Sequence, residues 1–382
     1  MSALPYGIAV LPILAWIYLL AARGGFWRTP RELASGHGAP ARRIVAVIPA
    51  RDEAAVIGAA VESLLRQELA GELHVIVVDD GSSDDTSGEV RRAAARAGAE
   101  ARATVIRGAP LESGWTGKLW AMSQGVAAAA SLAPDYVLFT DADIHHERGN
   151  VASLVAIAES DHRDLVSYMV RLSARTLAER LLIPAFVFFF FKLYPPAWVA
   201  SDRSGAAAAA GGCMLIRPEA LRRMGGLEAI RSEIIDDCAL ARAVKRSGGR
   251  VWLGLTEHAR SLRVYGSFRE IGAMISRTAF NQLRHSYLLL AATLVGLVLT
   301  YLLPPALLVS RDPVLVALGA VGLGLMSLCY WPMVRFYGLA PWWSLSLPLV
   351  TLFYGGATLH SAVRYALGRG GEWKGRIQDS RT

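Results

Sequence analysis

The chain has 382 residues, 53% of them hydrophobic, and a mean hydropathy of +0.34. That is too apolar for an ordinary soluble enzyme and too polar for a protein made only of membrane spans, so it favours a soluble domain joined to membrane segments. The net charge of +8 comes almost entirely from arginine. We attribute it to contact with anionic lipid headgroups rather than to nucleic-acid binding.

Residues 4–22 carry no charged side chain and are long enough to cross a bilayer as a helix. Arg23, Arg28 and Arg31 follow at once, and the positive-inside rule places that end in the cytoplasm. A cleaved signal peptide is the alternative, but no basic region precedes the apolar run. We therefore predict a transmembrane anchor over residues 1–23.

Residues 42–265 predict a soluble α/β domain. Short β-branched runs such as "RIVAVIPA", "LHVIVVDD" and "DYVLFTDAD" alternate with stretches of helical spacing such as "AAVIGAAVESLLRQ". This alternation predicts a largely parallel sheet, in which ligands bind at the carboxyl ends of the strands. The three cysteines, Cys213, Cys238 and Cys329, form no CxxC pair and are expected to be reduced.

Apolar stretches of spanning length return at 286–309, 313–333 and 342–363, so we predict C-terminal transmembrane helices within 286–363. Residues 266–285 are expected to form an interfacial amphipathic region, and 364–382 a basic tail. Residues 181–200 are also very apolar, but Lys192 and three prolines favour a segment lying on the membrane over a fifth span. Its four consecutive phenylalanines, Phe188 to Phe191, are expected to touch lipid or the tail of the acceptor. One span before the domain and three after it would place the basic tail outside, which conflicts with the positive-inside rule.

The stretch "FTDADIHHE" places acidic side chains at the end of an apolar strand. Asp141 and Asp143 are two residues apart, so both can converge with His145 on one cation where the strand ends. Oxygen ligands favour Mg²⁺ or Mn²⁺, and an added imidazole favours Mn²⁺. A solvated acidic turn is the alternative, since two aspartates at this spacing are common.

Three further groups of residues predict contacts to a nucleotide. Asp79 and Asp80 close a strand before a Gly-Ser turn, where they can accept hydrogen bonds from a base or a ribose, or simply support the turn. Glu53 follows the first strand and either faces the same cleft or caps a helix. Lys118 lies between glycines and a helix start, a place suited to a diphosphate, and a surface lysine is the alternative.

The stretch "SEIIDDCALA" places Asp236 and Asp237 in an apolar helical context. Partial desolvation raises the pKa of a carboxyl toward the range useful for a general base. A helix N-cap with a solvated neighbour is the alternative.

Taken in order, "VIPARDE", "VVDDGSSDDT", "GKLWA", "FTDADIHH", "GGCMLIRPEAL" and "EIIDDCAL" resemble the family 2 glycosyltransferases of GT-A fold. With the membrane segments, "NQLRHS" and "EWKGR", the chain looks most similar to the hopene-associated glycosyltransferases, which are related to the ceramide and carotenoid acid glycosyltransferases. The resemblance implies a Rossmann-like nucleotide-diphospho-sugar transferase domain.

The resemblance also implies roles for individual residues. Ala50, Arg51, Glu53 and Asp80 would hold the nucleotide, with Asp141 and Asp143 as the DxD pair and His145 as a further metal ligand. Asp237 would be the catalytic base, with Asp236 in place of the usual Glu. Gly212 and Cys213, with Gln282 and Arg284, would lie on the acceptor side. Ser286 stands where processive members carry Trp, which favours a single transfer.

The expected function is therefore metal-dependent, inverting transfer of a sugar from a nucleotide sugar, UDP-linked by the resemblance, to a lipid in hopanoid or related lipid biosynthesis. Polyprenyl phosphate is an alternative acceptor. A degenerate, non-catalytic scaffold and a Mg²⁺-dependent phosphohydrolase are the rival functions. The expected location is the bacterial inner membrane with the catalytic domain in the cytoplasm, and no protein partner is expected.

Overall fold

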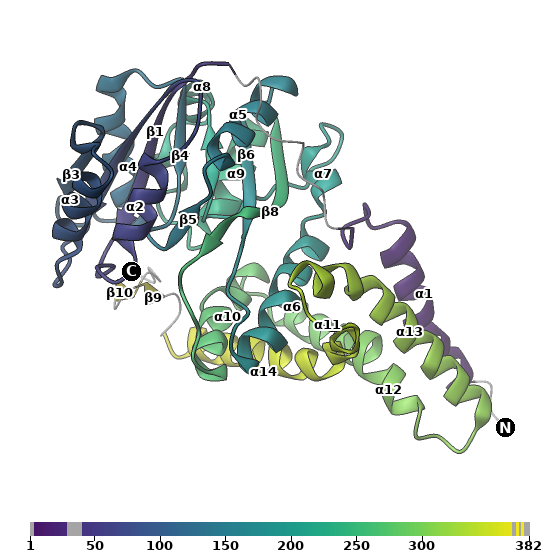
Figure 1. The fold of residues 1–382 in the computed structure, drawn as a ribbon. Coiled ribbons are helices and arrows are strands. Elements are labelled where there is room, and N and C mark those ends of the chain that lie inside the picture. Colours follow the sequence, from purple (N-terminus) through teal and green to yellow (C-terminus); the bar gives the residue numbers. More distant parts are fainter. Residues whose placement is uncertain (1–3, 29–39, 369–371, 374–375, 378–382) are drawn as a thin grey trace. The chain divides into compact units, whose positions relative to one another are not determined.

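The computed structural model describes residues 4–28, 40–368, 372–373 and 376–377 (Figure 1). The chain forms two compact units. The first, here called the helical unit, comprises residues 1–29, 174–197 and 264–371, and the second, the sheet unit, comprises 30–173, 198–263 and 372–382. Residues 174–197, which lie inside the range predicted for the α/β domain, 42–265, belong to the helical unit.

The sheet unit is built on an eight-stranded sheet in the order β3-β2-β1-β4-β7-β6-β8-β5. Strands β1, β2, β3 and β4 are parallel to one another, as the sequence predicts, and β6 is parallel to β8. Strand β7 runs antiparallel to both β4 and β6, and β5 runs antiparallel to β8. The sheet is thus mixed. The strands are β1 (Arg43–Ala50), β2 (Glu72–Asp79), β3 (Ala103–Arg107), β4 (Tyr136–Phe139), β5 (Ile144–His146), β6 (Leu165–Arg171), β7 (Met214–Ile216) and β8 (Val251–Ser261), with β9 (Glu372–Trp373) and β10 (Arg376–Ile377) as a separate pair.

Helices cover both faces of this sheet. The apolar sides of α2, α3 and α5 share one core with the side chains of β1 and β2 that point to them, including Ile57, Val90 and Leu154. On α4, an added Cβ at Gly125 would lie only 2.3 Å from Val47 Cγ1 of β1, so this helix packs closely on the strands. The helices of the unit are α2 (Ile57–Leu65), α3 (Thr86–Arg96), α4 (Gly117–Ala129), α5 (Asn150–Ser160), α8 (Pro218–Arg223) and α9 (Asp236–Arg246), with short turns η1 (Glu100–Arg102), η2 (Ala130–Leu132) and η3 (Leu227–Ile230).

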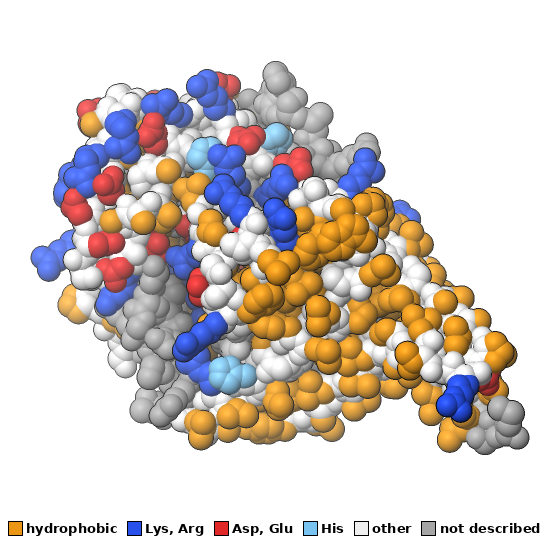
Figure 2. Space-filling model, turned by 60° about the horizontal axis from the view of Figure 1, so that its bottom comes forward, with side chains coloured by type: hydrophobic (Ala, Val, Ile, Leu, Met, Phe, Trp, Pro, Cys, Tyr) orange, Lys and Arg blue, Asp and Glu red, His pale blue; other side chains and the backbone are white. Residues whose placement is uncertain are grey.

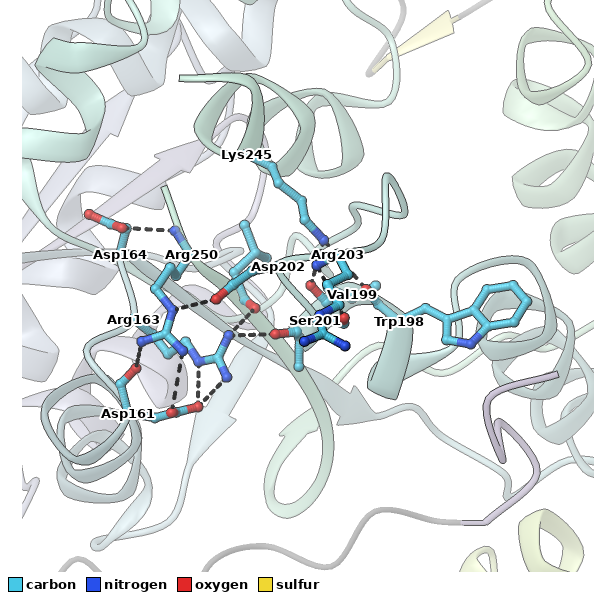
Figure 3. A network of polar contacts seen from close by, with 12 residues as sticks. Asp161, Arg163, Asp164, Trp198, Val199, Ser201, Asp202, Arg203, Lys245 and Arg250 are labelled. Carbon is cyan, nitrogen blue, oxygen red and sulfur yellow. Dashed lines mark hydrogen bonds and ion pairs between the residues drawn. The ribbon is translucent and has the colours of Figure 1, made fainter. Parts of the chain in front are cut away.

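A group of cations fixes the segment 198–206 within the sheet unit (Figure 3). Lys245 Nζ of α9 donates to the carbonyl oxygens of Trp198, Val199 and Ala206, at 3.4, 2.9 and 2.7 Å. Arg163, itself buried, donates to the carbonyl oxygen of Ala200 at 2.7 Å. The chain that enters the sheet unit after α7 (Pro196–Ala200) is therefore held by charge-assisted hydrogen bonds to its backbone.

Replacing Lys245 with Met should loosen this segment, because three carbonyl oxygens lose one shared ammonium donor. Hydrogen bonds to charged groups contribute about 2 kcal/mol, so amides of residues 200–206 should exchange their hydrogens roughly 30-fold faster. Hydrogen exchange read by mass spectrometry measures this. Arg242→Met, a half-exposed position on the same helix, is the control and should leave the exchange unchanged. Equal exchange in both variants would show that Lys245 does not hold the segment.

The helical unit contains α1 (Leu4–Ala21), α6 (Leu177–Leu193), α10 (Phe268–Gln282), α11 (Tyr287–Leu297), η4 (Val298–Leu302), α12 (Leu303–Leu307), α13 (Pro313–Phe336), η5 (Pro341–Ser346) and α14 (Leu347–Ala366). Three helices in the described residues are long and apolar enough to cross a membrane: Leu4–Ala21, Tyr287–Leu307 and Pro313–Phe336. The predicted anchor and two of the predicted C-terminal spans are among them. The third predicted span, 342–363, is not.

The apolar segment 181–200 forms most of α6 and is not a candidate span either. Its helix begins with a capping box, in which Thr176 Oγ1 accepts from the Glu179 N–H and Glu179 accepts from the backbone at Thr176. The prediction that all four phenylalanines from 188 to 191 face lipid or an acceptor tail is wrong for Phe188 and Phe191, which are buried. The Phe189 ring packs 5.0 Å from that of Tyr354 in α14, so α6 forms part of the core of this unit.

Candidate active site

The residues predicted from strand ends do come together at one edge of the sheet. Because β1, β2 and β4 are parallel and adjacent, their carboxyl ends bring Ala50, Asp80 and Asp141 to the same edge. The Asp80 N–H donates to the Ala50 carbonyl at 2.8 Å. Arg51 Nη1 donates to the Asp80 carbonyl at 2.8 Å and lies 3.6 Å from its carboxylate. This edge is where an open α/β sheet binds its ligand.

The two aspartates that close β2 have different surroundings. Asp79 accepts hydrogen bonds from the Ser82 N–H and from the Ser87 hydroxyl, so both of its oxygens support the turn that follows the strand. Asp80 is buried beside Arg51. Asp80 is therefore better placed than Asp79 to bind a nucleotide, and the alternative of a turn-supporting carboxylate applies to Asp79.

Asp143 is held by partners that are distant in the sequence. Ser261 Oγ at the end of β8 donates to Asp143 Oδ2 at 2.7 Å, and Arg263 Nε lies 3.6 Å from the same oxygen. Arg263 also pairs with Glu53 at 3.1 Å, which links the end of β1 to the DxD turn. Burial raises the pKa of Asp143, and the charge of Asp141 raises it further.

Lys118, at the start of α4, joins the DxD turn to the acidic pair of α9. Its Nζ lies 2.9 Å from Asp141 Oδ1 and 3.1 Å from Asp236 Oδ2. Burial alone would lower the pKa of this lysine, but Asp141 and Asp236 raise it well above its usual range, so Lys118 carries a positive charge. One ammonium thus bridges carboxylates from two elements that are about 95 residues apart in the sequence.

Asp237 lies next to this bridge at the start of α9. The Gly211 N–H donates to its Oδ2 at 2.9 Å, and the Cys238 N–H donates to its Oδ1 at 2.7 Å. Burial and the neighbouring charge of Asp236 raise the pKa of Asp237 to about 6, while Lys118 opposes this rise. A carboxyl with such a pKa can accept a proton near neutral pH.

An added Cβ at Gly211 would lie 3.2 Å from Lys118 Nζ and 3.5 Å from Asp237 Oδ2. Gly211 is not among the residues predicted from the sequence, although the "GGCM" motif marks the place. Nor is a buried network behind the DxD turn, in which Thr140 Oγ1 bonds to His146 Nε2 at 3.0 Å and donates to the Gly212 carbonyl at 2.8 Å. This network connects the end of β4 to the glycine turn beside Asp237.

Two predicted site residues take other places. The Cys213 side chain is fully buried and its thiol lies 3.7 Å from Asn150 Nδ2, so it does not face an acceptor. His145 is paired with Arg260 at the sheet edge, because β5 and β8 form an antiparallel ladder. Across the described ranges, no three Asp, Glu, His or Cys side chains gather closely enough to hold a metal by themselves. The predicted three-ligand site of Asp141, Asp143 and His145 is therefore not assembled.

The two DxD carboxylates still fit a hard divalent cation in one respect. Each is already next to a protein cation, Asp141 next to Lys118 and Asp143 next to Arg263, so this turn is built to accept positive charge. Carboxylate oxygens are the ligands that Mg²⁺ and Mn²⁺ prefer. A metal here would need further oxygens from a bound ligand, such as a diphosphate.

Gln282 and Arg284 belong to the helical unit, and their surroundings are described there. Gln282 Nε2 donates to the Tyr194 hydroxyl. Arg284 is exposed, and both it and His285 adopt the left-handed backbone conformation, with φ of 53° and 55°. The His285 ring is stacked on Tyr365 at 4.0 Å, which supports this unusual turn.

A protein-family model described as "Glycosyltransferase like family 2" matches residues 40–268, more than half of the chain. The chain belongs to glycosyltransferase family 2. The match covers every strand of the eight-stranded sheet and each of the strand-end residues described above. No curated protein matches the sequence of this chain.

Among solved structures, the chain is similar to the mannosyltransferase PcManGT from Pyrobaculum calidifontis, described in complex with GDP-Man and Mn²⁺. The identity is 18%, the alignment covers 96% of this chain and 97% of that one, and the TM-score is 0.56. It is also similar to glucosyl-3-phosphoglycerate synthase from Mycobacterium tuberculosis, at 22% identity over 64% of this chain and 79% of that one, with a TM-score of 0.41. At 18% identity the likeness to PcManGT concerns the fold alone, and with the family match it shows the fold of the GT-A glycosyltransferases.

Proposed function

We propose that this glycosyltransferase is a membrane-bound, inverting enzyme that transfers one sugar from a nucleotide sugar to a lipid hydroxyl. The arrangement around Lys118 carries the proposal. It places a carboxyl with a raised pKa, Asp237, next to the turn that would bind the donor diphosphate. Donor binding and proton acceptance are thereby assigned to neighbouring residues.

On the donor side, Arg51 and Asp80 at the ends of β1 and β2 would hold the nucleoside, with Glu53 beside them. Lys118 would pair with the diphosphate. Asp141 and Asp143 would hold a divalent cation, which supplies positive charge to the departing diphosphate. PcManGT, which has the same fold and is described in complex with GDP-Man and Mn²⁺, supports both a nucleotide-sugar donor and a divalent cation.

On the acceptor side, Asp237 would take the proton of the attacking hydroxyl. The hydroxyl oxygen forms a bond to the anomeric carbon as the bond from that carbon to the diphosphate oxygen breaks, and the nucleoside diphosphate leaves. A single in-line displacement inverts the anomeric configuration. The Gly211 and Cys238 N–H groups keep the Asp237 carboxylate oriented while it accepts the proton.

The membrane helices support a lipid as the acceptor. Three candidate spans in the same chain would keep the active site at a membrane surface, where an amphiphilic hydroxyl is concentrated. The resemblance to hopene-associated enzymes favours a hopanoid or related lipid, and Ser286 in place of the Trp of processive members favours a single transfer. Polyprenyl phosphate is the second acceptor class, supported by the same helices.

Purified full-length enzyme, incubated with a panel of nucleotide sugars, Mn²⁺ or Mg²⁺ and bacterial lipid extract, tests the proposal. The expected product is a lipid carrying one sugar whose anomeric configuration is opposite to that of the donor. Free sugar without glycolipid would instead support hydrolysis. No turnover with any donor that stabilises the protein would support a non-catalytic scaffold.

Asp143→Ala should abolish the metal-dependent part of donor binding while the protein stays folded. The reason is that Asp143, in the turn between β4 and β5, would be a direct cation ligand, while its partners in the fold, Ser261 and Arg263, are polar side chains outside the apolar core. The measurement is the rise in melting temperature caused by a UDP-sugar with Mn²⁺. Asp85→Ala, an exposed carboxylate on the same unit, is the control. If Asp143→Ala keeps the full rise, Asp143 is not a metal ligand.

A further inference from the structure

One face of α14 is apolar and uncovered. Its exposed large side chains recur with helical spacing over the whole helix and the residues that flank it: Leu345, Leu349, Leu352, Leu359, Val363 and Leu367. The opposite face is buried within the unit and combines apolar residues such as Leu347 and Val350 with polar ones such as Thr351 and Ser361. A row of exposed leucines on the outer face is unusual for a helix in water, so this face is suited to an apolar environment. Figure 2 shows how much of the surface of the helical unit is hydrophobic.

The inner face of α14 packs against α10 along most of its length, and the two helices run in the same direction (Figure 1). Near their starts, the rings of Phe268 and Phe353 are 6.1 Å apart. In the middle, Ser276 Oγ donates to the Ala357 carbonyl at 3.2 Å. Near their ends, the Phe280 ring lies 5.3 Å from that of Tyr365. Because the two helices pack together along their length, the depth and orientation of α14 in a membrane also determine those of α10.

The charges on α10 decide between crossing a membrane and lying on it. Arg269, Glu270 and Arg277 are exposed on α10. Ser276 touches Ala357, which is near the middle of α14, so Arg277 lies at that level too. If α14 crossed a bilayer, Arg277 would be placed near the centre of the hydrocarbon, where a charged side chain is strongly disfavoured. If α14 lies flat, the charged side of α10 can stay in water or among headgroups.

The other helices of this unit have the geometry of membrane spans. The Tyr6 hydroxyl, near the start of α1, bonds to Asp312, just before α13, so these two helices start at the same end. Midway along, Trp16 Nε1 donates to the Thr300 carbonyl at 3.0 Å in the helix that runs from Tyr287 to Leu307. In Figure 1, α1 and α13 lie side by side, whereas α14 runs in another direction.

If only two spans follow the sheet unit instead of three, the position of the basic tail no longer conflicts with the positive-inside rule. Two spans, Tyr287–Leu307 and Pro313–Phe336, separate the sheet unit from α14, so α14 begins on the side that holds the sheet unit. If α14 does not cross, the tail stays on that side too. The basic residues that follow α1 and those at the end of the chain then share one side, as the positive-inside rule requires: Arg23, Arg28, Arg31, Arg364, Arg369, Lys374, Arg376 and Arg381.

We propose that α14 lies in the plane of an anionic membrane surface, on the side of the sheet unit, with its leucine face inserted at the boundary between headgroups and acyl chains. The stacked Trp342 and Trp343 in η5, the turn just before the helix, have ring centroids 4.7 Å apart and are the residue type that anchors segments at this depth. Arg335 and Arg364, at the ends of α13 and α14, face the same negatively charged layer. The occupant of the apolar face is lipid, and this conclusion does not depend on the reaction catalysed.

A depth profile along α14 tests the position of the helix. Single cysteines replace Leu349, Gly356 or Val363 in the full-length protein, are labelled with bimane and are placed in vesicles containing phosphatidylglycerol. Nitroxide lipids quench the label at either a shallow or a deep position. All three labels should show the same shallow depth, whereas a spanning helix would place residue 356 much deeper than the other two. Gly324→Cys, at an open position in the middle of α13, is the deep control.

Labelling in intact cells tests the side of the membrane. The three native cysteines are buried, so the parent protein should not react. With an impermeant maleimide, Gly368→Cys after α14 should behave like Glu100→Cys in the sheet unit and opposite to Ser310→Cys between α12 and α13. If Gly368→Cys instead behaves like Ser310→Cys, α14 crosses the membrane and the proposal fails.

A second copy of this chain is the other possible occupant of the leucine face. In that case, bimane at position 352 would not be quenched by lipid nitroxides, and Leu352→Cys would form an intermolecular disulfide in vesicles. Strong lipid quenching without such a disulfide is the expected result. The opposite result would overturn the assignment of this face to lipid.

Discussion

Asp237→Asn should lower kcat by about 10³-fold, within the range of 10² to 10⁴ that a general base contributes. The amide keeps the size of the side chain and one acceptor for the Gly211 or Cys238 N–H, but it cannot take a proton. Donor binding depends on other residues, so the dissociation constant of the nucleotide sugar should change less than threefold. Initial rates of glycolipid formation and calorimetric donor titrations measure the two effects.

Asp236→Asn is the matched control, since it removes the neighbouring carboxylate of the same helix. Asp236 is paired with Lys118 and its Oδ2 has no further hydrogen-bond partner, so its loss should reduce the rate by less than tenfold. A larger loss in Asp236→Asn than in Asp237→Asn would exchange the roles of the two residues. Equal donor affinity in all three proteins is required before either rate is interpreted.

Much of the donor side could be predicted from the sequence, because its residues follow strands that are themselves recognisable. Asp80 and Asp141 end apolar β-branched runs, and parallel neighbours bring such ends together without further information. The partners of Asp143 could not be found in this way. Ser261 and Arg263 lie at the far end of β8, about 120 residues away, and their place depends on antiparallel strand pairing that no local pattern reports.

The membrane part shows a similar limit. Composition predicted spans within 4–22, 286–309 and 313–333, and the structure forms candidate spans there over Leu4–Ala21, Tyr287–Leu307 and Pro313–Phe336, since a long apolar helix is visible in the sequence itself. Composition also suggested a span at 342–363. What argues against that span is a neighbour, α10, whose Arg277 lies level with the middle of α14. Likewise, the phenylalanines of α6 were predicted to face lipid or the acceptor tail, but Phe188 packs on Phe26, in the turn after α1, and on Tyr330 of α13.

Lys118→Met should lower kcat/KM at pH 7 by about 10² to 10³-fold, and the loss should depend on pH. In the wild type, activity should rise with pH through about 6 as Asp237 loses its proton, since burial and Asp236 raise its pKa to that value. The charges facing Asp237 are Asp236 on its own helix, which raises its pKa, and Lys118 on α4, which lowers it together with the hydrogen bonds from the Cys238 and Gly211 N–H groups. Without Lys118, the pKa should rise by roughly 1 to 3, as for other carboxylates that lose a close cation. The variant should therefore remain protonated and inactive at pH 7 and recover part of its activity toward pH 9.

Lys118→Arg keeps the charge and is the control. Its activity should be lower than that of the wild type, because a guanidinium is larger than an ammonium and the space beside Gly211 is tight, but the acid limb of its pH profile should stay near that of the wild type. A melting curve of each variant establishes that the protein is folded, since removing one partner from a buried ion pair is destabilising. A loss of activity in Lys118→Met that is the same at every pH would assign Lys118 to diphosphate binding alone. An acid limb that moves to higher pH in Lys118→Met but not in Lys118→Arg would show that the positive charge at this position keeps Asp237 ionised. The same ammonium is next to Asp141 of the DxD turn, so one cation would serve both the donor side and the base.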